Sequence, residues 1–340
     1  MAGQFCTSCN FETAISPLDP GPFDTVVGNP VINVGMGPAG NNTITLPQGS
    51  QVGIAPIGMT AFALGFGMKM AAPPTALTTI VAITLATAGG VTLSIDPTGA
   101  LSFRVGGQGT ISAPSGTFLF NGSRQYLGLY ISGIGSLVRA PQTVTIQYEG
   151  AVVGTGPGGT QQGTSYSNFV WGALSNLAAP MEIDSLYLLD LTGSARNYLL
   201  GKRVVLPAVI VGAGQFSQYA PVGAPAPWQC VAPIPPGGDL LYAWDTTIGD
   251  QLACAVGAPS GLASVDFVMQ RASARQEISS GGRSIALGIG DGTNVVYGPT
   301  QTLPVDYTGL NQVWDKDPTT GADWTLPSVS ARQAAVKTVS

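Results

Sequence analysis

The chain has 340 residues, of which only 9% are charged, and its formal net charge is −5. An ordinary globular protein is about one quarter charged, so long helices held together by Glu–Lys pairs are excluded. The sequence contains no histidine, which removes the usual general base at neutral pH and the commonest metal ligand. The acidic balance argues against nucleic acid as a partner, because proteins that bind it carry basic patches.

The first 24 residues differ from the rest of the chain in their proline content. Pro17, Pro20 and Pro22 stand among scattered acids, and the segment has too few periodic apolar residues for a helix or strand. This pattern predicts an extended N-terminal arm rather than a packed element. The arm is either a frayed terminus or a segment that docks on a partner. No basic and apolar segment typical of a signal peptide opens the sequence.

Residues 25–195 show the alternation of side chains that predicts strands. In residues 60–70 (TAFALGFGMKM), large apolar side chains recur at a period of two and fall on one face. In residues 91–105, two alternating segments flank Asp-Pro-Thr-Gly at positions 96–99, and this turn chemistry predicts a β-hairpin. Further strands are predicted at residues 29–35, 79–85, 125–132, 141–148 and 181–189, and the glycine-rich residues 154–163 predict a loop or a sheet edge.

One uncharged stretch, residues 76–95, is long enough to cross a bilayer. It contains several threonines and the pair Gly89-Gly90, and it lacks flanking basic residues and an aromatic belt. Its β-branched centre, residues 79–85, favours a buried strand. We therefore expect no membrane contact.

A domain boundary is predicted where the strand at residues 181–189 gives way to Asp190-Leu-Thr-Gly-Ser and a proline-rich stretch. The second half has predicted strands at 252–256, 263–270, 284–289 and 294–297, and one short C-terminal helix over about 328–335, with Ser328 as its cap. Turn signals recur roughly every 8–12 residues, the spacing of a sandwich or jelly roll. The sequence thus predicts an all-β protein with two β-sandwich domains, residues 25–195 and 196–340, and very little helix.

The four cysteines form two pairs in the sequence, Cys6/Cys9 and Cys230/Cys254. Cys230 and Cys254 either remain thiols or form a disulfide; a zinc site is disfavoured because no histidine is available to complete it. If Cys6 and Cys9 oxidise, bonds to another chain are as reasonable as a bond between the two. We expect no metal and no other cofactor.

Without histidine, catalysis would depend on carboxylates, and a glycosidase needs two of them facing each other about 5–10 Å apart. The sequence places its closest carboxylates on turns or along single strands, so we expect no enzymatic activity. The five tryptophans are expected mostly as core or interface anchors. Trp171 and Trp244 are the candidates for stacking against a sugar ring.

Two segments resemble modules of tailed-bacteriophage virion proteins. Residues 181–194 (MEIDSLYLLDLTGS) with 200–205 (LGKRVV) resemble the segment that closes a laminin-G or concanavalin-A-like lectin domain in those proteins, and residues 313–325 (VWDKDPTTGADWT) resemble a second element of the same group. The first segment departs from the pattern at Lys202, where the family usually has Asp. The resemblance extends over roughly residues 60–340.

The resemblance implies a concanavalin-A-like sandwich and a structural protein of the virion, such as a fibre, collar or tail-associated component, assembled in the cytoplasm of the bacterial host. It implies partners of two kinds: further copies of the chain in a homo-oligomer, and other virion proteins reached through the N-terminal arm. The alternative functions are a lectin-like adhesin that binds host glycan and a decoration protein of the capsid.

Overall fold

The structure is a computed structural model, and it describes residues 6–9, 23, 25–33, 43–55, 59–85, 90–105, 108–132, 143–157, 165–191, 198–201, 203, 206, 208–233, 238–257, 259, 263–277 and 282–340. Its contacts divide the chain into two compact units, Met1–Val205 and Leu206–Ser340. The predicted boundary, after residue 195, lies somewhat earlier in the chain than this division.

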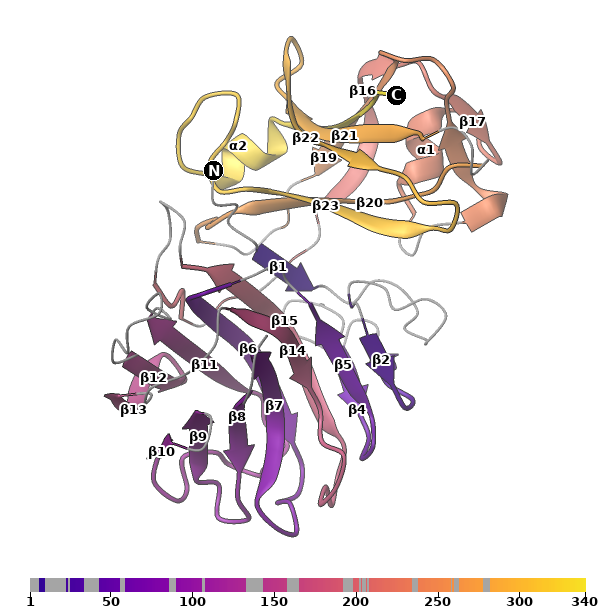
Figure 1. The fold of residues 1–340 in the computed structure, drawn as a ribbon. Coiled ribbons are helices and arrows are strands. Elements are labelled where there is room, and N and C mark those ends of the chain that lie inside the picture. The colour runs from indigo at the N-terminus through magenta and orange to yellow at the C-terminus, as the bar shows by residue number, and fades with distance from the viewer. Residues whose placement is uncertain are drawn as a thin grey trace. The chain divides into compact units, whose positions relative to one another are not determined.

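Unit 1 consists of two antiparallel sheets (Figure 1). In its described residues, one sheet has eight strands, in the order β13 (Ala151–Pro157), β12 (Thr143–Tyr148), β11 (Gln125–Ser132), β6 (Phe62–Met70), β15 (Met181–Asp190), β4 (Thr43–Leu46) and β3 (Val31–Asn33), with β1 (Cys6–Cys9) also paired to β15. The other has seven, in the order β10 (Gln108–Ser112), β9 (Leu101–Val105), β8 (Gly90–Ile95), β7 (Thr78–Leu85), β14 (Tyr166–Trp171), β5 (Gln51–Ile54) and β2 (Thr25–Val27).

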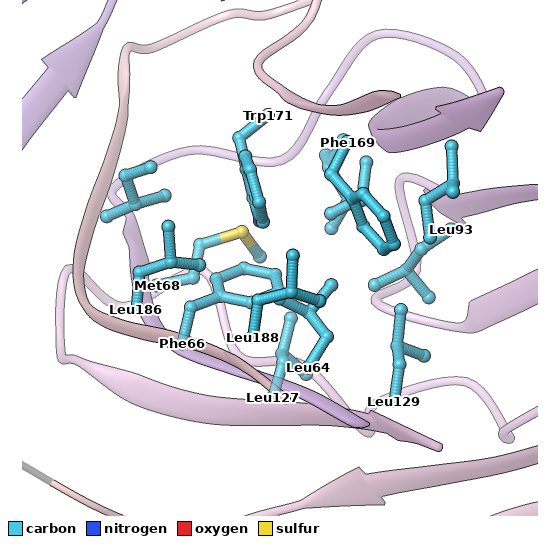
Figure 2. Packing of buried hydrophobic residues seen from close by; sticks show 14 of the residues in the cluster. Leu64, Phe66, Met68, Leu93, Leu127, Leu129, Phe169, Trp171, Leu186 and Leu188 are labelled. Atoms are coloured by element: carbon cyan, nitrogen blue, oxygen red, sulfur yellow. The ribbon is translucent and has the colours of Figure 1, made fainter. Parts of the chain in front are cut away.

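The core of unit 1 lies between these sheets and follows from the period-two pattern of β6. Leu64, Phe66 and Met68 are fully buried, and they point toward Phe169 and Trp171 of the opposite sheet (Figure 2). Alternate residues of a strand point to opposite faces, so one strand supplies a row of large side chains to the core. The predicted strand at residues 60–70 is confirmed.

The predicted hairpin is formed by β8 and β9, which pair from Val91↔Val105 to Ile95↔Leu101. Asp96 Oδ1 accepts hydrogen bonds from the backbone N–H of Thr98 (2.8 Å) and of Ala100 (3.0 Å). Gly99 has a φ of +79°, which side-chain-bearing residues rarely adopt. The turn chemistry read from residues 96–99 therefore accounts for the connection.

Part of the predicted arm belongs to the fold of unit 1. Cys6–Cys9 pairs antiparallel with β15, from Cys6↔Leu189 to Cys9↔Leu186, and Phe23 is buried in the core cluster. The prediction of an unpacked arm is wrong for these residues, because β15 offers free backbone groups on one side and the sandwich offers an apolar site for Phe23. The other residues of the arm lie outside the described part of the chain.

Unit 2 is built on a five-stranded sheet, counted over the described residues, in the order β16 (Val209–Ser217), β19 (Gln251–Gly257), β24 (Gln333–Thr338), β21 (Ser284–Gly290) and β22 (Val295–Thr302). The ribbon β20 (Val268–Ala274)–β23 (Thr308–Trp314) lies beside it (Figure 1). Ile285 and Leu287 of β21 pack with Leu310 of β23 in one cluster. The remaining elements are the ribbon β17 (Ala220–Val222)–β18 (Tyr242–Trp244), the helices α1 (Pro227–Val231) and α2 (Leu326–Ser330), and the 3-10 turn η2 (Gly238–Leu240).

The predicted C-terminal helix is largely wrong. The helix that forms, α2, ends at Ser330, and its cap is Thr325, with Ser328 as the reciprocal partner in a capping box. Gln333–Thr338 is instead the central strand β24, paired with β19 on one side and β21 on the other. Two neighbouring strands satisfy its backbone on both edges, and this tertiary context overrides the helix propensity of Ala334 and Ala335.

The all-β prediction with very little helix is confirmed. Residues 76–95 contain the whole of β7 and β8, and β7 is the strand that the β-branched pattern indicated. Within the described part of the chain, no helix is long and apolar enough to cross a membrane.

Candidate ligand surface of unit 2

The two candidate sugar-stacking tryptophans have opposite environments. Trp171 is 0% exposed and lies in the core of unit 1 (Figure 2). The prediction that it stacks on a ligand is wrong, because its position on β14 directs the indole between the two sheets. Trp244 of β18 is 49% exposed, so its ring is open to solvent.

The exposure of Trp244 has a local cause in the β17–β18 ribbon. Trp244 pairs with Ala220, and Tyr242, two residues earlier on the same face, pairs with Val222. These small partners leave both rings uncovered, and Tyr242 is 36% exposed. The segment therefore presents two aromatic side chains from a strand, which holds them more rigidly than a loop would.

The residues just before β18 add polar groups. Asp239 Oδ1 accepts a hydrogen bond from Arg275 Nη2 at 2.9 Å and one from the hydroxyl of Tyr307 at 3.0 Å. The guanidinium of Arg275 lies over the Tyr307 ring, 5.0 Å from its centroid. Partial burial, together with the hydrogen bond to Asp239 and its negative charge, raises the pKa of Tyr307, so its hydroxyl stays protonated at neutral pH.

We group under the name aromatic surface the residues Asp239, Leu240, Tyr242 and Trp244, which follow one another closely in the chain, and Arg275 and Tyr307, which contact Asp239. Leu240 is 85% exposed, which is unusual for so large an apolar side chain. A surface that combines flat apolar rings with a few oriented polar groups is suited to bind a ligand that has both apolar and hydroxyl-bearing faces.

Sequence reasoning found Trp244 and missed the other members of this surface. Arg275 and Tyr307 lie 36 and 68 positions from Asp239, and no local pattern brings such residues together. The signal that was available is the density of large apolar side chains in residues 240–244 (LLYAW) next to a charged residue.

Of the two alternatives for Cys230 and Cys254, free thiols or a disulfide, the structure shows free thiols. Cys230 and Cys254 are both buried and free, so the proposed disulfide is absent. The thiol of Cys230, in α1, donates to the carbonyls of Val222 (3.5 Å) and Ala226 (3.6 Å), and burial raises the pKa of Cys254 to about 12. For Cys6 and Cys9 the structure describes the backbone pairing of β1 alone.

Among the described residues, no group of three or more Cys, Asp or Glu could hold a metal ion.

Of the segment at residues 181–205, the strand β15 contributes Asp184 and Tyr187 to a closed polar layer on the outer face of the eight-stranded sheet. The hydroxyl of Tyr126 donates to that of Tyr187 at 2.8 Å, and Arg124 forms an ion pair with Asp184. Tyr126 and Tyr187 are 2% and 1% exposed. These side chains are closed to a ligand, so they stabilise unit 1 rather than form a binding surface.

The segment at residues 313–325 contains the end of β23 and a turn that is held by hydrogen bonds to Asp317. Asp317 is 1% exposed, and its carboxylate accepts hydrogen bonds from Arg332 and Thr319. Burial by itself would raise the pKa of Asp317, but these hydrogen bonds and the positive charge of Arg332 outweigh it, so the pKa is lowered. The indole N–H of Trp324 donates to the Trp314 carbonyl at 2.7 Å. Both tryptophans are buried.

No family model matches the chain, and no curated protein matches its sequence. Solved structures resemble it weakly. The cellulose-induced protein Cip1 is 11% identical with a TM-score of 0.42, covering 58% of this chain and 100% of that one. The binding domain of botulinum neurotoxin serotype D is 10% identical with a TM-score of 0.35 (85% and 92% covered). The exoplasmic domain of VIP36, solved with Ca²⁺ and Man3GlcNAc, is 12% identical with a TM-score of 0.32 (45% and 81%).

Proposed function

We propose that this chain is a non-enzymatic saccharide-binding protein, and that the aromatic surface of unit 2 holds the sugar. The observation that carries the proposal is the half-exposed indole of Trp244 on a rigid strand beside Tyr242. The C–H face of a pyranose ring packs against an indole, and the sugar hydroxyls take hydrogen bonds from polar groups at the edge.

The polar groups of the surface favour binding over hydrolysis. Asp239 is the one carboxylate of the aromatic surface, and Arg275 and Tyr307 already donate to it. A retaining or inverting glycosidase needs two carboxyl groups facing each other across the bond to be cleaved. The surface as defined supplies one, so its role is recognition.

A role on a bacteriophage virion is supported by the resemblance of residues 181–205 and 313–325 to modules of phage structural proteins. In this second candidate function the chain is a structural component assembled in the host cytoplasm as a homo-oligomer, and unit 2 contacts the glycan of the host surface. Because Cys6–Cys9 pairs with β15 of the same chain and Phe23 is buried in the core of unit 1, we assign docking on other virion proteins to the other residues of the segment 1–24.

Saccharide binding is tested with Trp244→Ala and the matched control Tyr198→Ala, which removes a similarly exposed aromatic ring (52%) from unit 1. The purified chain is titrated with host surface polysaccharide, and binding is followed by affinity electrophoresis. We expect Trp244→Ala to weaken binding about tenfold and Tyr198→Ala to leave it unchanged. Equal affinity of Trp244→Ala and the unaltered chain would refute the proposal.

The virion role is tested by mass spectrometry of purified particles and by deletion of residues 2–24. We expect the chain in the particles, and we expect the deletion to reduce its incorporation while unit 2 still folds. A chain that is missing from particles, or that is monomeric and degrades polysaccharide, would contradict this reading.

A further inference from the structure

A shallow, open depression on the five-stranded sheet of unit 2 lies outside the aromatic surface. It has a volume of about 300 Å³ and is lined by residues of β21, β22 and β24 and by the turn at 248–249, among them Ile248, Tyr297, Thr300 and Lys337. We call it the Lys337 groove. Its volume is at the lower end of the range for small-ligand sites, which suits a single sugar unit.

The strand register builds the floor of this groove. Lys337 of β24 lies directly opposite Ala286 of β21, which in turn lies opposite Thr300 of β22. With strands about 4.8 Å apart, Lys337 and Thr300 are about 10 Å apart at their backbones, and a single methyl group lies between them. The irregular register between Ala286 and Gly288 pairs Gly288 with Tyr297, so the ring of Tyr297 shares this face with Thr300.

Tyr297 is held in place at both ends. Its ring lies against Gly288, where a Cβ would come within 2.7 Å of the ring atom Cδ1, and its hydroxyl donates to Oε1 of Gln251 on β19. Burial raises the pKa of Tyr297 to about 12, so the ring stays neutral. The groove thus has a rigid aromatic wall.

Lys337 differs from the other lysines of the described chain because no carboxylate pairs with it. Lys69 pairs with Glu182 and Lys316 with Asp323, whereas the Lys337 ammonium lies over the Tyr297 ring, 5.7 Å from Nζ to the ring centroid. Among the described residues that line the groove, Lys337 is also the one that carries a charge.

Two aspartates adjoin residues that line the groove, Asp245 through its contact with Thr338 and Asp250 as the neighbour of Gly249 in the sequence. Asp245 accepts from the hydroxyl of Thr338 (2.7 Å) and from the backbone of Thr247 (3.1 Å). Asp250 accepts from the amide of Gln218 (3.4 Å). Neither aspartate forms an ion pair with Lys337, and no ion pair within the described part of the chain involves it, so its ammonium is open to an anion from solution.

We infer that the Lys337 groove binds an acidic sugar, with the carboxylate of the sugar on Lys337, a hydroxyl on Thr300 and the C–H face against Ile248, which is 65% exposed. The inference rests on the proposed function in that the ligand is a saccharide, but it concerns a different site. It adds a selectivity for acidic glycans that the aromatic surface does not provide.

The test uses the full chain and matched pairs of probes: oligogalacturonate and oligoglucuronate, each also as the methyl ester, with acetate as a simple carboxylate. Binding is measured by isothermal titration at low ionic strength, because a single exposed ion pair is screened by salt. The variants are Lys337→Gln, with Lys316→Gln as the matched control, and Trp244→Ala.

We expect an acidic oligosaccharide to bind, and its methyl ester and the Lys337→Gln variant each to lose affinity on the order of tenfold, the effect of one charge-assisted hydrogen bond. Lys316→Gln should bind normally. Equal binding of acid and ester, an unchanged Lys337→Gln variant, acetate binding as tight as the sugar, or no acidic sugar bound at 10 mM (an order-of-magnitude ceiling for a weak single-sugar site) would each overturn the inference. Trp244→Ala separates the proposals: it should weaken the host polysaccharide and leave the acidic probe unaffected.

Discussion

The buried ion pair between Asp317 and Arg332 provides a sharp test of what holds unit 2 together. Arg332 Nε lies 3.1 and 3.0 Å from the two carboxylate oxygens of Asp317, and Nη2 lies 2.6 Å from Oδ2. Thr319 adds hydrogen bonds from its backbone N–H (3.0 Å) and hydroxyl (2.8 Å). Replacing Arg332 by Met keeps most of the side-chain length, but it removes the positively charged guanidinium and all of its hydrogen bonds to Asp317.

The expected cost is about 3 kcal/mol, because Asp317 is 1% exposed and would keep its charge with Thr319 alone as a donor. The double variant Asp317→Asn/Arg332→Met should lose much less, about 1 kcal/mol, since no charge is then left unpaired. Urea unfolding followed by tryptophan fluorescence measures both, because four of the five tryptophans belong to unit 2. A single variant that loses less than the double variant would refute the reasoning.

The same pair predicts the pH dependence of unit 2. The pKa of Asp317 is lowered from its ordinary value of 3.8 in the folded state. A lowered pKa contributes stability above the unfolded value, and this contribution is lost as the pH falls through the folded pKa. Unfolding of the unaltered chain between pH 5 and pH 2, as order-of-magnitude limits around that value, should depend more steeply on pH than that of Asp317→Asn. Parallel curves would contradict the assignment.

Three further outcomes follow from the packing. Gly65→Ala should destabilise unit 1 by about 1–3 kcal/mol in urea unfolding, because the added methyl group collides with Tyr126. Cys230 and Cys254 should both resist a thiol reagent in the native chain and react in denaturant, since both are buried; fewer than two reactive thiols from this pair under denaturing, non-reducing conditions would reveal a disulfide. Trp244→Ala should shift the free energy of unfolding by no more than about 0.5 kcal/mol, and a larger loss would show that the ring is structural.

The local elements of this fold were open to prediction because their causes lie within a few residues. The turn at positions 96–99 depends on the Asp96 carboxylate and on the positive φ of Gly99. The burial of Phe66 and its neighbours on β6 depends on their alternation. Prediction failed where the deciding contacts come from distant parts of the sequence. Residues 333–338 form a strand and not a helix because β19 and β21 pair with them on both sides.

The candidate sites follow the same division. Composition and short-range pattern were enough to predict an all-β protein without histidine chemistry, but they offered Trp171 and Trp244 as equal candidates for stacking against a sugar. The tertiary structure decided that Trp171 is core while Trp244 is exposed, that Asp239 meets Arg275 and Tyr307, and that Lys337 faces a groove without an acidic partner. The physical reason is that exposure and charge pairing depend on which strands become neighbours, and contacts between residues tens of positions apart set that order.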